Sequence, residues 1–243
     1  RDSWASRGLG DVYKRQTSES VTEGHPDKLC DYIADSILDE YLKKDENSRT
    51  AIEVFAHKNN ITVVGQVTSK AQIEIEDLIR DKIKEIGYDN ELTDMDYRTC
   101  KINIDIAKQS PDIALGVDVG GAGDQGIMFG YACDETENYM PYAINLAHKL
   151  AKRLTQTRKE NIIPYLRPDG KTQVTVEYEN DKPKRVETIL ISTQHLENVS
   201  LEELKKDIKE KVINCVVEPN MIDKNTKICL LYTSDAADDG ESV

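Results

Sequence analysis

Apolar side chains recur at three- and four-residue intervals over residues 29–42, and this spacing predicts an amphipathic helix. Pro26 suits the first turn of that helix, because the amide that proline lacks has no intrahelical partner there. The apolar face consists of Leu29, Ile33, Ile37, Leu38, Tyr41 and Leu42. Residues 51–57 and 61–68 instead alternate and are rich in β-branched side chains, so they predict a hairpin closed by residues 58–60.

A second helix and a further strand complete this first group of elements. The helix is predicted over residues 73–86, with Gly87 as its C-terminal stop. The strand is predicted over residues 100–107, where apolar residues again alternate. A glycine-rich stretch over residues 108–126 then predicts a loop.

The same order of elements returns after the glycine-rich stretch. A strand is predicted over residues 126–132 and a helix over residues 140–158. Ser200 and Glu203 form a capping-box pattern, which predicts a helix that runs toward Val216. The remaining predicted elements are a hairpin around Asn180 and Asp181, with strands at residues 172–179 and 186–193, and a last strand at residues 226–231.

Helix, hairpin, helix and strand thus occur twice, without residue-level identity between the copies. This pattern predicts an α+β fold of two pseudo-repeated domains, in which helices cover one face of each sheet. We expect an N-terminal domain over residues 17–112, a mobile linker over residues 113–121 and a central domain over residues 122–230. Residues 1–16 and 231–243 lack periodicity and resemble translated sequencing adapters, so we expect both to be non-native tails.

Composition narrows the class of protein. The chain has 243 residues, of which 38% are hydrophobic, and a net charge of −13, which suits a folded acidic protein and disfavours nucleic-acid binding. No apolar run approaches the ~18 residues of a membrane span, and no apolar signal segment lies near the start. The five cysteines form no C-x-x-C pair, which favours free thiols in a reducing cytoplasm over a zinc site.

Residues 23–28 (EGHPDK) are the first segment with candidate chemistry. A helix that begins at Pro26 offers amide groups and a favourable dipole to an anion, and His25 and Lys28 add donors for phosphate oxygens. Asp27 is a carboxylate of the kind that Mg²⁺ prefers. Taken alone, the segment is explained better by local structure, with His25 as a cap, Asp27 favouring the dipole and Lys28 solvated.

Two further segments lie in the glycine-rich loop. Gln109 belongs to KQSPD at its start, and Asp124 lies among closely spaced glycines that let a backbone approach a ligand. Neither segment is a Walker A loop or a dinucleotide-binding fingerprint. A flexible connection explains the first segment equally well. The second segment is a weak signal by itself, and its alternative is a tight turn before a strand.

The last candidate segment is RPDGK at residues 167–171, directly before a predicted strand. Its Asp169 and Lys171 are able to hold a nucleotide. A plain Pro-Asp-Gly turn accounts for the segment on local grounds.

Together and in this order, the segments resemble the S-adenosylmethionine synthetase (methionine adenosyltransferase) family. The resemblance covers residues 17–230 and is carried by GHPDK, GQVTSKA, QSPDI, GAGDQGIMFGYA, MPYAINLAHKL, PYLRPDGKTQVTVEY and ISTQH. It implies that family's fold, with two of its three domains present. It also implies formation of S-adenosylmethionine from L-methionine and ATP, with release of pyrophosphate and phosphate.

The resemblance further implies cofactors, partners and site residues. The cofactors are Mg²⁺, two ions per site, and K⁺. The chain is expected to form a homodimer or homotetramer with its sites between subunits. The implied roles are catalysis for His25 and Lys28, ATP binding for His25, Asp124, Asp169, Gly170 and Lys171, methionine binding for Gln66 and Gln109, Mg²⁺ binding for Asp27 and K⁺ binding for Glu53.

Two departures from the family pattern modify this expectation. Gln66 stands where the family usually has a glutamate that contacts the methionine amino group, so we expect weaker methionine binding. The glycine-rich, Arg-Lys and Lys-Asp motifs of the family's final third do not occur, so we expect a truncated chain that is inactive alone. The alternative is a non-catalytic ATP- or phosphate-binding module, or a subunit that partners a complete one.

Overall fold

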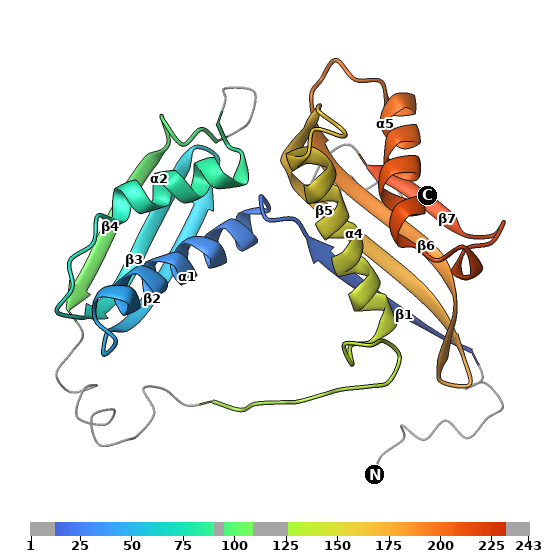
Figure 1. Ribbon diagram of the computed structural model, residues 1–243, viewed down its shortest axis with the longest axis horizontal. Coiled ribbons are helices and arrows are strands. Elements are labelled where there is room, and N and C mark those ends of the chain that lie inside the picture. Colours follow the sequence, from blue (N-terminus) through green and yellow to red (C-terminus); the bar gives the residue numbers. More distant parts are fainter. Residues whose placement is uncertain (1–12, 90–94, 109–125, 232–243) are drawn as a thin grey trace, which may run out of the picture. The chain divides into compact units, whose positions relative to one another are not determined.

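The computed structural model describes residues 13–89, 95–108 and 126–231. The chain forms two compact units, each with its own sheet and its own helices (Figure 1). We name them the three-stranded unit, Glu23–Gly130, and the four-stranded unit, Arg1–Thr22 together with Tyr131–Val243. Two sheets with helices confirm the predicted α+β class.

The three-stranded unit has the strand order β2-β3-β4. Strands β2 and β3 pair antiparallel as a hairpin, and β4 joins β3 in parallel after the crossover through helix α2. The element bounds are α1 (Pro26–Lys44), β2 (Arg49–His57), β3 (Asn60–Thr68), α2 (Ile75–Ile86) and β4 (Lys101–Lys108).

Its core lies between the two helices and the sheet. Leu29, Ile33 and Ile37 of α1 are buried together with Ile79 and Ile83 of α2, and the sheet contributes fully buried side chains from β3. The predicted apolar face of α1 is therefore largely confirmed, but Leu42 near its end is 38% exposed. Helix α2 ends as predicted, because Gly87 adopts the left-handed conformation with φ 108° that glycine tolerates best.

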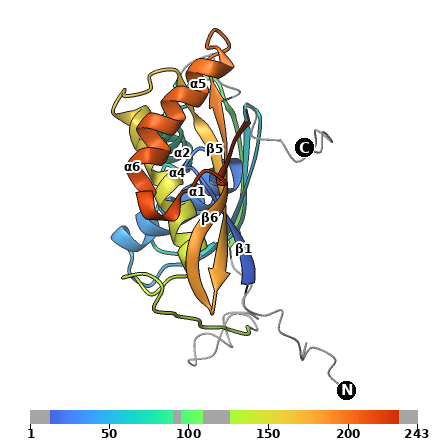
Figure 2. The same ribbon diagram turned by 90° about the vertical axis from the view of Figure 1, so that its right-hand side faces the viewer.

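The four-stranded unit has the strand order β1-β5-β6-β7. Its helices lie on one side of the sheet, as the edge-on view shows (Figure 2). The element bounds are β1 (Tyr13–Val21), α4 (Tyr142–Lys159), β5 (Leu166–Glu179), β6 (Lys182–His195), α5 (Leu201–Asp207), the π-helix η1 (Ile208–Ile213), α6 (Asn214–Val216), the 3-10 turn η2 (Pro219–Met221) and β7 (Lys227–Leu231).

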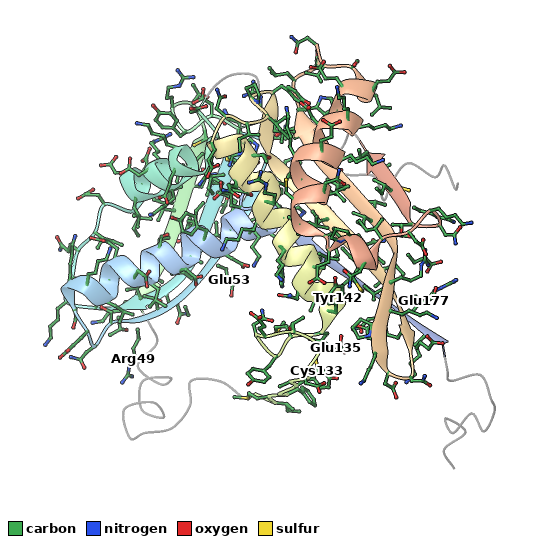
Figure 3. All side chains as sticks on the ribbon, turned by 45° about the vertical axis from the view of Figure 1, so that its right-hand side comes forward. Arg49, Glu53, Cys133, Glu135, Tyr142 and Glu177 are labelled. Carbon is green, nitrogen blue, oxygen red and sulfur yellow. The ribbon has the colours of Figure 1, made fainter. Side chains whose placement is uncertain are left out.

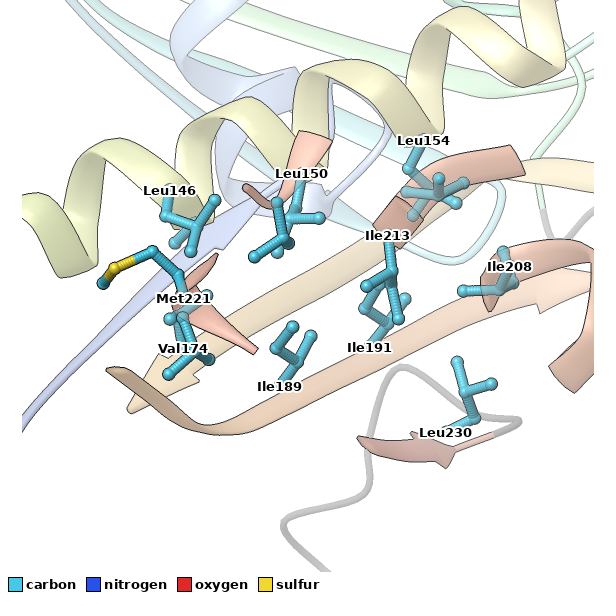
Figure 4. Close-up of a cluster of buried hydrophobic side chains, with 14 of the residues drawn as sticks. Leu146, Leu150, Leu154, Val174, Ile189, Ile191, Ile208, Ile213, Met221 and Leu230 are labelled. Atoms are coloured by element: carbon cyan, nitrogen blue, oxygen red, sulfur yellow. The ribbon is translucent and has the colours of Figure 1, made fainter. Parts of the chain in front are cut away.

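Its core is formed by aliphatic side chains from helix α4, from the α5–η1 segment and from the sheet (Figure 4). The labelled residues include Leu146, Leu150 and Leu154, which recur along α4 at four-residue spacing and face the strands. Ile189 and Ile191 of β6 are fully buried beneath them. Burial of this face supplies the main driving force for the fold of the unit.

The predicted repeat is present in the topology. In each unit a hairpin is followed by a helix and then by a strand that lies parallel to the second hairpin strand. The second hairpin turns at Asn180 and Asp181, both with positive φ, as predicted. The Ser200 Oγ accepts a hydrogen bond from the Glu203 amide at 3.2 Å, which confirms the predicted cap.

Strand β1 departs from the expected organisation. It begins at Tyr13, within the range expected to be a tail without packed structure, and it pairs antiparallel with β5 over its whole length. The compact units consequently divide after Thr22 and after Gly130, whereas the expected ranges divided the chain at residue 17 and at residues 113–121. The paired residues are 150–166 positions apart in the chain, so no local sequence pattern reveals this pairing.

The strand predicted over residues 126–132 is wrong. These residues form no strand, and the side chains of Ile127, Met128 and Phe129 are 84–94% exposed. Alternating apolar residues favour a strand, but a strand also needs a pairing partner. No helix of the described chain is long and apolar enough to cross a membrane.

Candidate functional site

The N-terminus of α1 is capped by His25. Its Nδ1 accepts a hydrogen bond from the Asp27 amide at 3.3 Å, and its carbonyl oxygen accepts from the Leu29 amide at 2.8 Å. The Tyr88 hydroxyl donates to the Gly24 carbonyl at 2.5 Å and anchors the turn before the cap. His25 is therefore a helix cap, as the local structural interpretation of this segment predicts. Because the cap uses Nδ1, only Nε2 of the ring remains available to a ligand.

Asp27 and Lys28 face solvent in the first turn of α1. The Asp27 side chain is 90% exposed, and the Lys28 ammonium pairs with Asp31 at 3.0 Å, with both side chains more than half exposed. An exposed ion pair of this kind contributes little to stability, so Lys28 can change partner at low cost. Both charged groups are open to a ligand at the helix N-terminus.

The described residues contain no group of three or more His, Cys, Asp or Glu side chains that could hold a metal by themselves. Mg²⁺ is commonly bound by only one or two carboxylates together with substrate phosphates and water. The exposed Asp27 carboxylate fits that kind of shared site. The exposed carboxylate of Glu53 is likewise suited to supply one oxygen ligand to K⁺.

Glu53 and Gln66 lie on the same face of the three-stranded sheet. Glu53 pairs with Val64, and Gln66 pairs with Ala51, so the two side chains are diagonal neighbours on adjacent strands. This is the face opposite the buried Ile61 and Val63, and Figure 3 shows Glu53 projecting from β2. The tertiary structure thus brings together two residues that the resemblance links to the site.

Gly65 makes the close approach of β2 and β3 possible beside Gln66. Its φ is +149°, and a Cβ at this position would lie 2.0 Å from the Ala51 carbonyl oxygen. Only glycine avoids that contact. The glycine of GQVTSKA therefore positions the following side chain on the open face.

The RPDGK segment lies inside strand β5, so the predicted Pro-Asp-Gly turn before a strand is wrong. Leu166 pairs with His195 and Gly170 pairs with Thr193, which leaves three residues of β5 opposite the single residue Gln194 of β6. This irregularity is a β-bulge, a feature that often re-aims side chains near functional sites. We call residues 167–169 the β5 bulge.

The β5 bulge is tightly enclosed. Pro168, Asp169 and Gly170 are all buried. A Cβ on Gly170 would lie 3.0 Å from Leu154 and 3.1 Å from the Ser192 carbonyl oxygen, so a larger residue there would have to displace these neighbours slightly. Lys171 follows on β5 with a half-buried side chain. Asp169, Gly170 and Lys171, the predicted ATP-binding residues, thus lie at one structurally defined place.

The predicted residues Gln109 and Asp124 lie outside the residues that the structure describes, as do residues 113–121, the expected mobile linker. Their roles stay predictions.

An acidic pocket in the four-stranded unit was not anticipated from the sequence. It is lined by Asp134, Glu135, Thr136, Glu137, Asn138, Tyr142, Asn145, Lys149 and Glu218. The Glu135 carboxylate accepts hydrogen bonds from the Tyr142 amide at 2.8 Å and from the Tyr178 hydroxyl at 2.7 Å (Figure 3). Burial, with a contribution from Glu218, raises the pKa of Tyr142 to about 12. Four carboxylates against one ammonium repel a polyphosphate, so we do not assign ATP to this pocket.

Comparisons with known proteins agree with the fold and with the site segments. Family models of the S-adenosylmethionine synthetase N-terminal domain and central domain match residues 14–111 and 119–235. The S-adenosylmethionine synthase of Clostridium botulinum is 52% identical over 225 residues, which are 87% of this chain and 58% of that relative. The synthases of Finegoldia magna and Brachyspira hyodysenteriae are 51% and 50% identical and are each covered to 57%.

Two units of one topology, with a capped helix N-terminus in one and a glycine-bearing bulge in the other, define an α+β protein of repeated domains. The two domain matches follow one another along the chain and together span most of it. The chain therefore belongs to the S-adenosylmethionine synthetase family, and it spans 57–58% of the length of the relatives named above.

Proposed function

We propose that the protein to which these residues belong is a methionine adenosyltransferase, which forms S-adenosylmethionine from L-methionine and ATP. The observation that carries this proposal is the N-terminus of α1, where a capping histidine, an exposed carboxylate and an exposed ammonium lie together. Such a helix end is suited to the polyphosphate of ATP.

The proposed reaction places its main demand on the leaving group. The methionine sulfur uses a lone pair to form a bond with C5′ of the ribose, and the C5′–O bond breaks with its electrons on the triphosphate oxygen. Sulfur needs no general base, because it carries no proton to remove. The triphosphate is then hydrolysed to pyrophosphate and phosphate. Groups that are already oriented toward the developing negative charge supply most of the stabilisation.

The cap defines the part that His25 plays in this proposal. Because Nδ1 accepts from the Asp27 amide, the proton of the neutral ring resides on Nε2. Nε2 is therefore a hydrogen-bond donor, and we propose that it donates to the departing triphosphate oxygen. Lys28 adds a positive charge beside the phosphates.

The remaining residues bind and orient the two substrates in this proposal. Asp169, Gly170 and Lys171 at the β5 bulge, with Asp124, hold ATP, whereas Gln66 and Gln109 hold methionine. Asp27 holds Mg²⁺ and Glu53 holds K⁺, and these cations, when bound, neutralise phosphate charge. Holding sulfur in line with C5′ lowers the entropic part of the barrier.

The test is His25→Asn in the full-length protein, with ATP, methionine, Mg²⁺ and K⁺ present and S-adenosylmethionine measured by mass spectrometry. Loss of one preorganised donor is expected to lower the rate about 100- to 1000-fold. His57→Asn is the matched control, because His57 is an exposed histidine at the hairpin end of β2. An unchanged rate in His25→Asn would refute the proposed role of His25.

The same assay separates catalysis from simple binding. If the wild-type full-length protein binds an ATP analogue in calorimetry but forms no product under excess substrate, the protein is a nucleotide-binding module or a partner subunit instead of an enzyme.

We also propose a homodimer or homotetramer. Phe55 and Val64 are 68% and 41% exposed on the open face of the three-stranded sheet, the face that carries Glu53 and Gln66. Apolar side chains on an open sheet face favour association with another protein surface. Sedimentation velocity of wild type and Phe55→Glu tests this, because a charge on the interface is expected to shift the species toward the monomer.

A cytoplasmic location is supported by cysteine chemistry. All five cysteines are free thiols, and a reducing compartment maintains that state.

A further inference from the structure

Thr22 makes three hydrogen-bond contacts at the β5 bulge, one with Pro168 inside it and two with Gly170 directly after it. It is the first residue after β1, and only 4% of its surface is exposed. Its Oγ1 lies 2.8 Å from the Pro168 carbonyl oxygen and 3.2 Å from the Gly170 carbonyl oxygen. Its amide donates to the same Gly170 carbonyl at 2.9 Å. Thr22 therefore contacts the backbone on both sides of Asp169.

The contacts of Thr22 lie on the β1 side of β5. Thr22 and Gly170 continue the β1–β5 register directly beyond the pair Val21 and Lys171, and the Thr22 amide donates to the Gly170 carbonyl oxygen as in an antiparallel ladder. The Thr22 hydroxyl adds a donor for the Pro168 carbonyl oxygen, which lies within the bulge. The threonine methyl completes the packing, because Thr22 Cγ2 lies only 3.3 Å from the position of a Cβ on Gly170. Both the hydroxyl and the shape of Thr22 therefore define the path of the bulge.

Two buried polar atoms, one in the bulge and one on β6 opposite it, are able to bond to a ligand. Arg167 Nε and Gln194 Oε1 are buried, and neither has a hydrogen-bond partner within the described part of the chain. One is a donor and the other is an acceptor, and they belong to residues that face each other across the irregular pairing. A buried polar atom without a partner is unfavourable, and a hydrogen bond to a ligand or to an ordered water removes that cost.

We propose that Thr22 is a positioning residue for ATP, one that holds the β5 bulge so that Asp169 and Lys171 are presented to the nucleotide. The proposal rests on the proposed function, because it requires that ATP binds at Asp169 and Lys171. Thr22 itself does not touch the nucleotide. It acts through the two carbonyl groups that flank Asp169, in the manner of the supporting residues behind a binding site.

The test uses the full-length protein, titrated with a non-hydrolysable ATP analogue in calorimetry. Thr22→Val keeps the shape of the side chain and removes the hydroxyl, and we expect analogue affinity to fall about 5- to 100-fold, the equivalent of one lost buried hydrogen bond. Thr22→Ser keeps the hydroxyl and is expected to restore affinity to within about threefold of wild type. The Michaelis constant for methionine is expected to stay unchanged in both variants. A loss of analogue affinity without a change in the methionine constant is not what general destabilisation produces.

Thr17→Val is the matched control. Thr17 lies on the same strand pair, and its hydroxyl bonds to the exposed Thr175 hydroxyl at 2.9 Å, away from the bulge. The control removes a hydroxyl from β1 without touching the bulge, and its analogue affinity is expected to equal that of wild type.

A second measurement covers the case in which Thr22→Val does not fold. Hydrogen exchange of the wild type with and without the analogue should show added protection in peptides covering both residues 166–172 and residues 19–24. Protection at 166–172 alone, or a folded Thr22→Val with wild-type affinity, overturns the role of Thr22 and leaves ATP binding intact. Failure of the wild type to bind the analogue overturns the proposed function and this inference with it.

Discussion

Gln66 presents a neutral amide on the open face of β3, where the family resemblance places a carboxylate beside the methionine amino group. A charge-assisted hydrogen bond contributes about 1.5–3 kcal/mol. In the full-length enzyme, Gln66→Glu should therefore lower the Michaelis constant for methionine about 10- to 100-fold and leave that for ATP unchanged. Gln72→Glu, which adds the same charge at another exposed position, is the control. Equal methionine constants for wild type and Gln66→Glu would contradict the assignment.

Gly65 and Gly130 make a matched pair for testing backbone constraint. A Cβ at Gly65 would lie 2.0 Å from the Ala51 carbonyl oxygen, whereas a Cβ at Gly130 meets nothing within 4 Å. We expect Gly65→Ala to lower the free energy of unfolding by about 1–3 kcal/mol or more, because β2 and β3 must separate, and Gly130→Ala to change it little. Urea denaturation monitored by circular dichroism measures both. Equal midpoints would show that the hairpin absorbs the added methyl group.

At the scale of residues, the sequence motifs located the candidate site segments, and the structure determined their local setting. His25 caps α1 as local reasoning indicates, because a cap depends only on the next few residues. No local sequence pattern indicates the contacts of Thr22, because its partners Pro168 and Gly170 are 146 and 148 residues away. Its only sequence signal is its position directly before EGHPDK.

Ser200 is the N-terminal cap of the α5–η1 helical segment. Its Oγ accepts from the Glu203 amide, and replacement of such a cap by alanine costs about 1 kcal/mol. Ser200→Ala should lower the urea midpoint without changing the slope, whereas Ser200→Asp, which keeps an acceptor, should stay close to wild type. If both variants match wild type, the packing of Leu204 and Ile208, and not the cap, determines where the segment begins.

At the scale of elements, predictions succeeded where periodicity and end signals agree. Helix α2 was placed to within two residues at its start, because its apolar stripe meets Gly87 at the end. The second hairpin was found from its Asn180-Asp181 turn. Residues 126–132 have the composition of a strand, but they pair with no other strand of the described chain. Residues 167–170 have the composition of a turn, but they are part of strand β5. Strand formation depends on a partner that local composition cannot reveal.

The whole molecule should lose stability at alkaline pH. Burial raises the pKa of Tyr142 to about 12, and burial together with hydrogen bonds to Asp207 and Glu135 raises the pKa values of Tyr165 and Tyr178. These phenols ionise near pH 10 in the unfolded chain and only at higher pH in the folded one. Their contribution is therefore complete below pH 10 and is lost as pH rises toward 12 and beyond.

The measurement is the urea midpoint from pH 9 to pH 12. Tyr142→Phe cannot ionise at this position and should flatten the decline relative to wild type, whereas Tyr139→Phe, at a side chain that is 68% exposed, should leave the decline unchanged. A decline of equal steepness in wild type and Tyr142→Phe would show that burial at residue 142 does not govern alkaline stability.

The sequence by itself determined the α+β class, the repeated order of helix, hairpin, helix and strand, and the family, because each depends on local periodicity or on contiguous motifs. Only the tertiary structure decided that β1 joins β5, that RPDGK forms a bulge held by Thr22, and that Glu53 and Gln66 share one sheet face. These features depend on strand register between distant segments. A shift of one residue reverses the face of every side chain, and no local pattern encodes the partner strand.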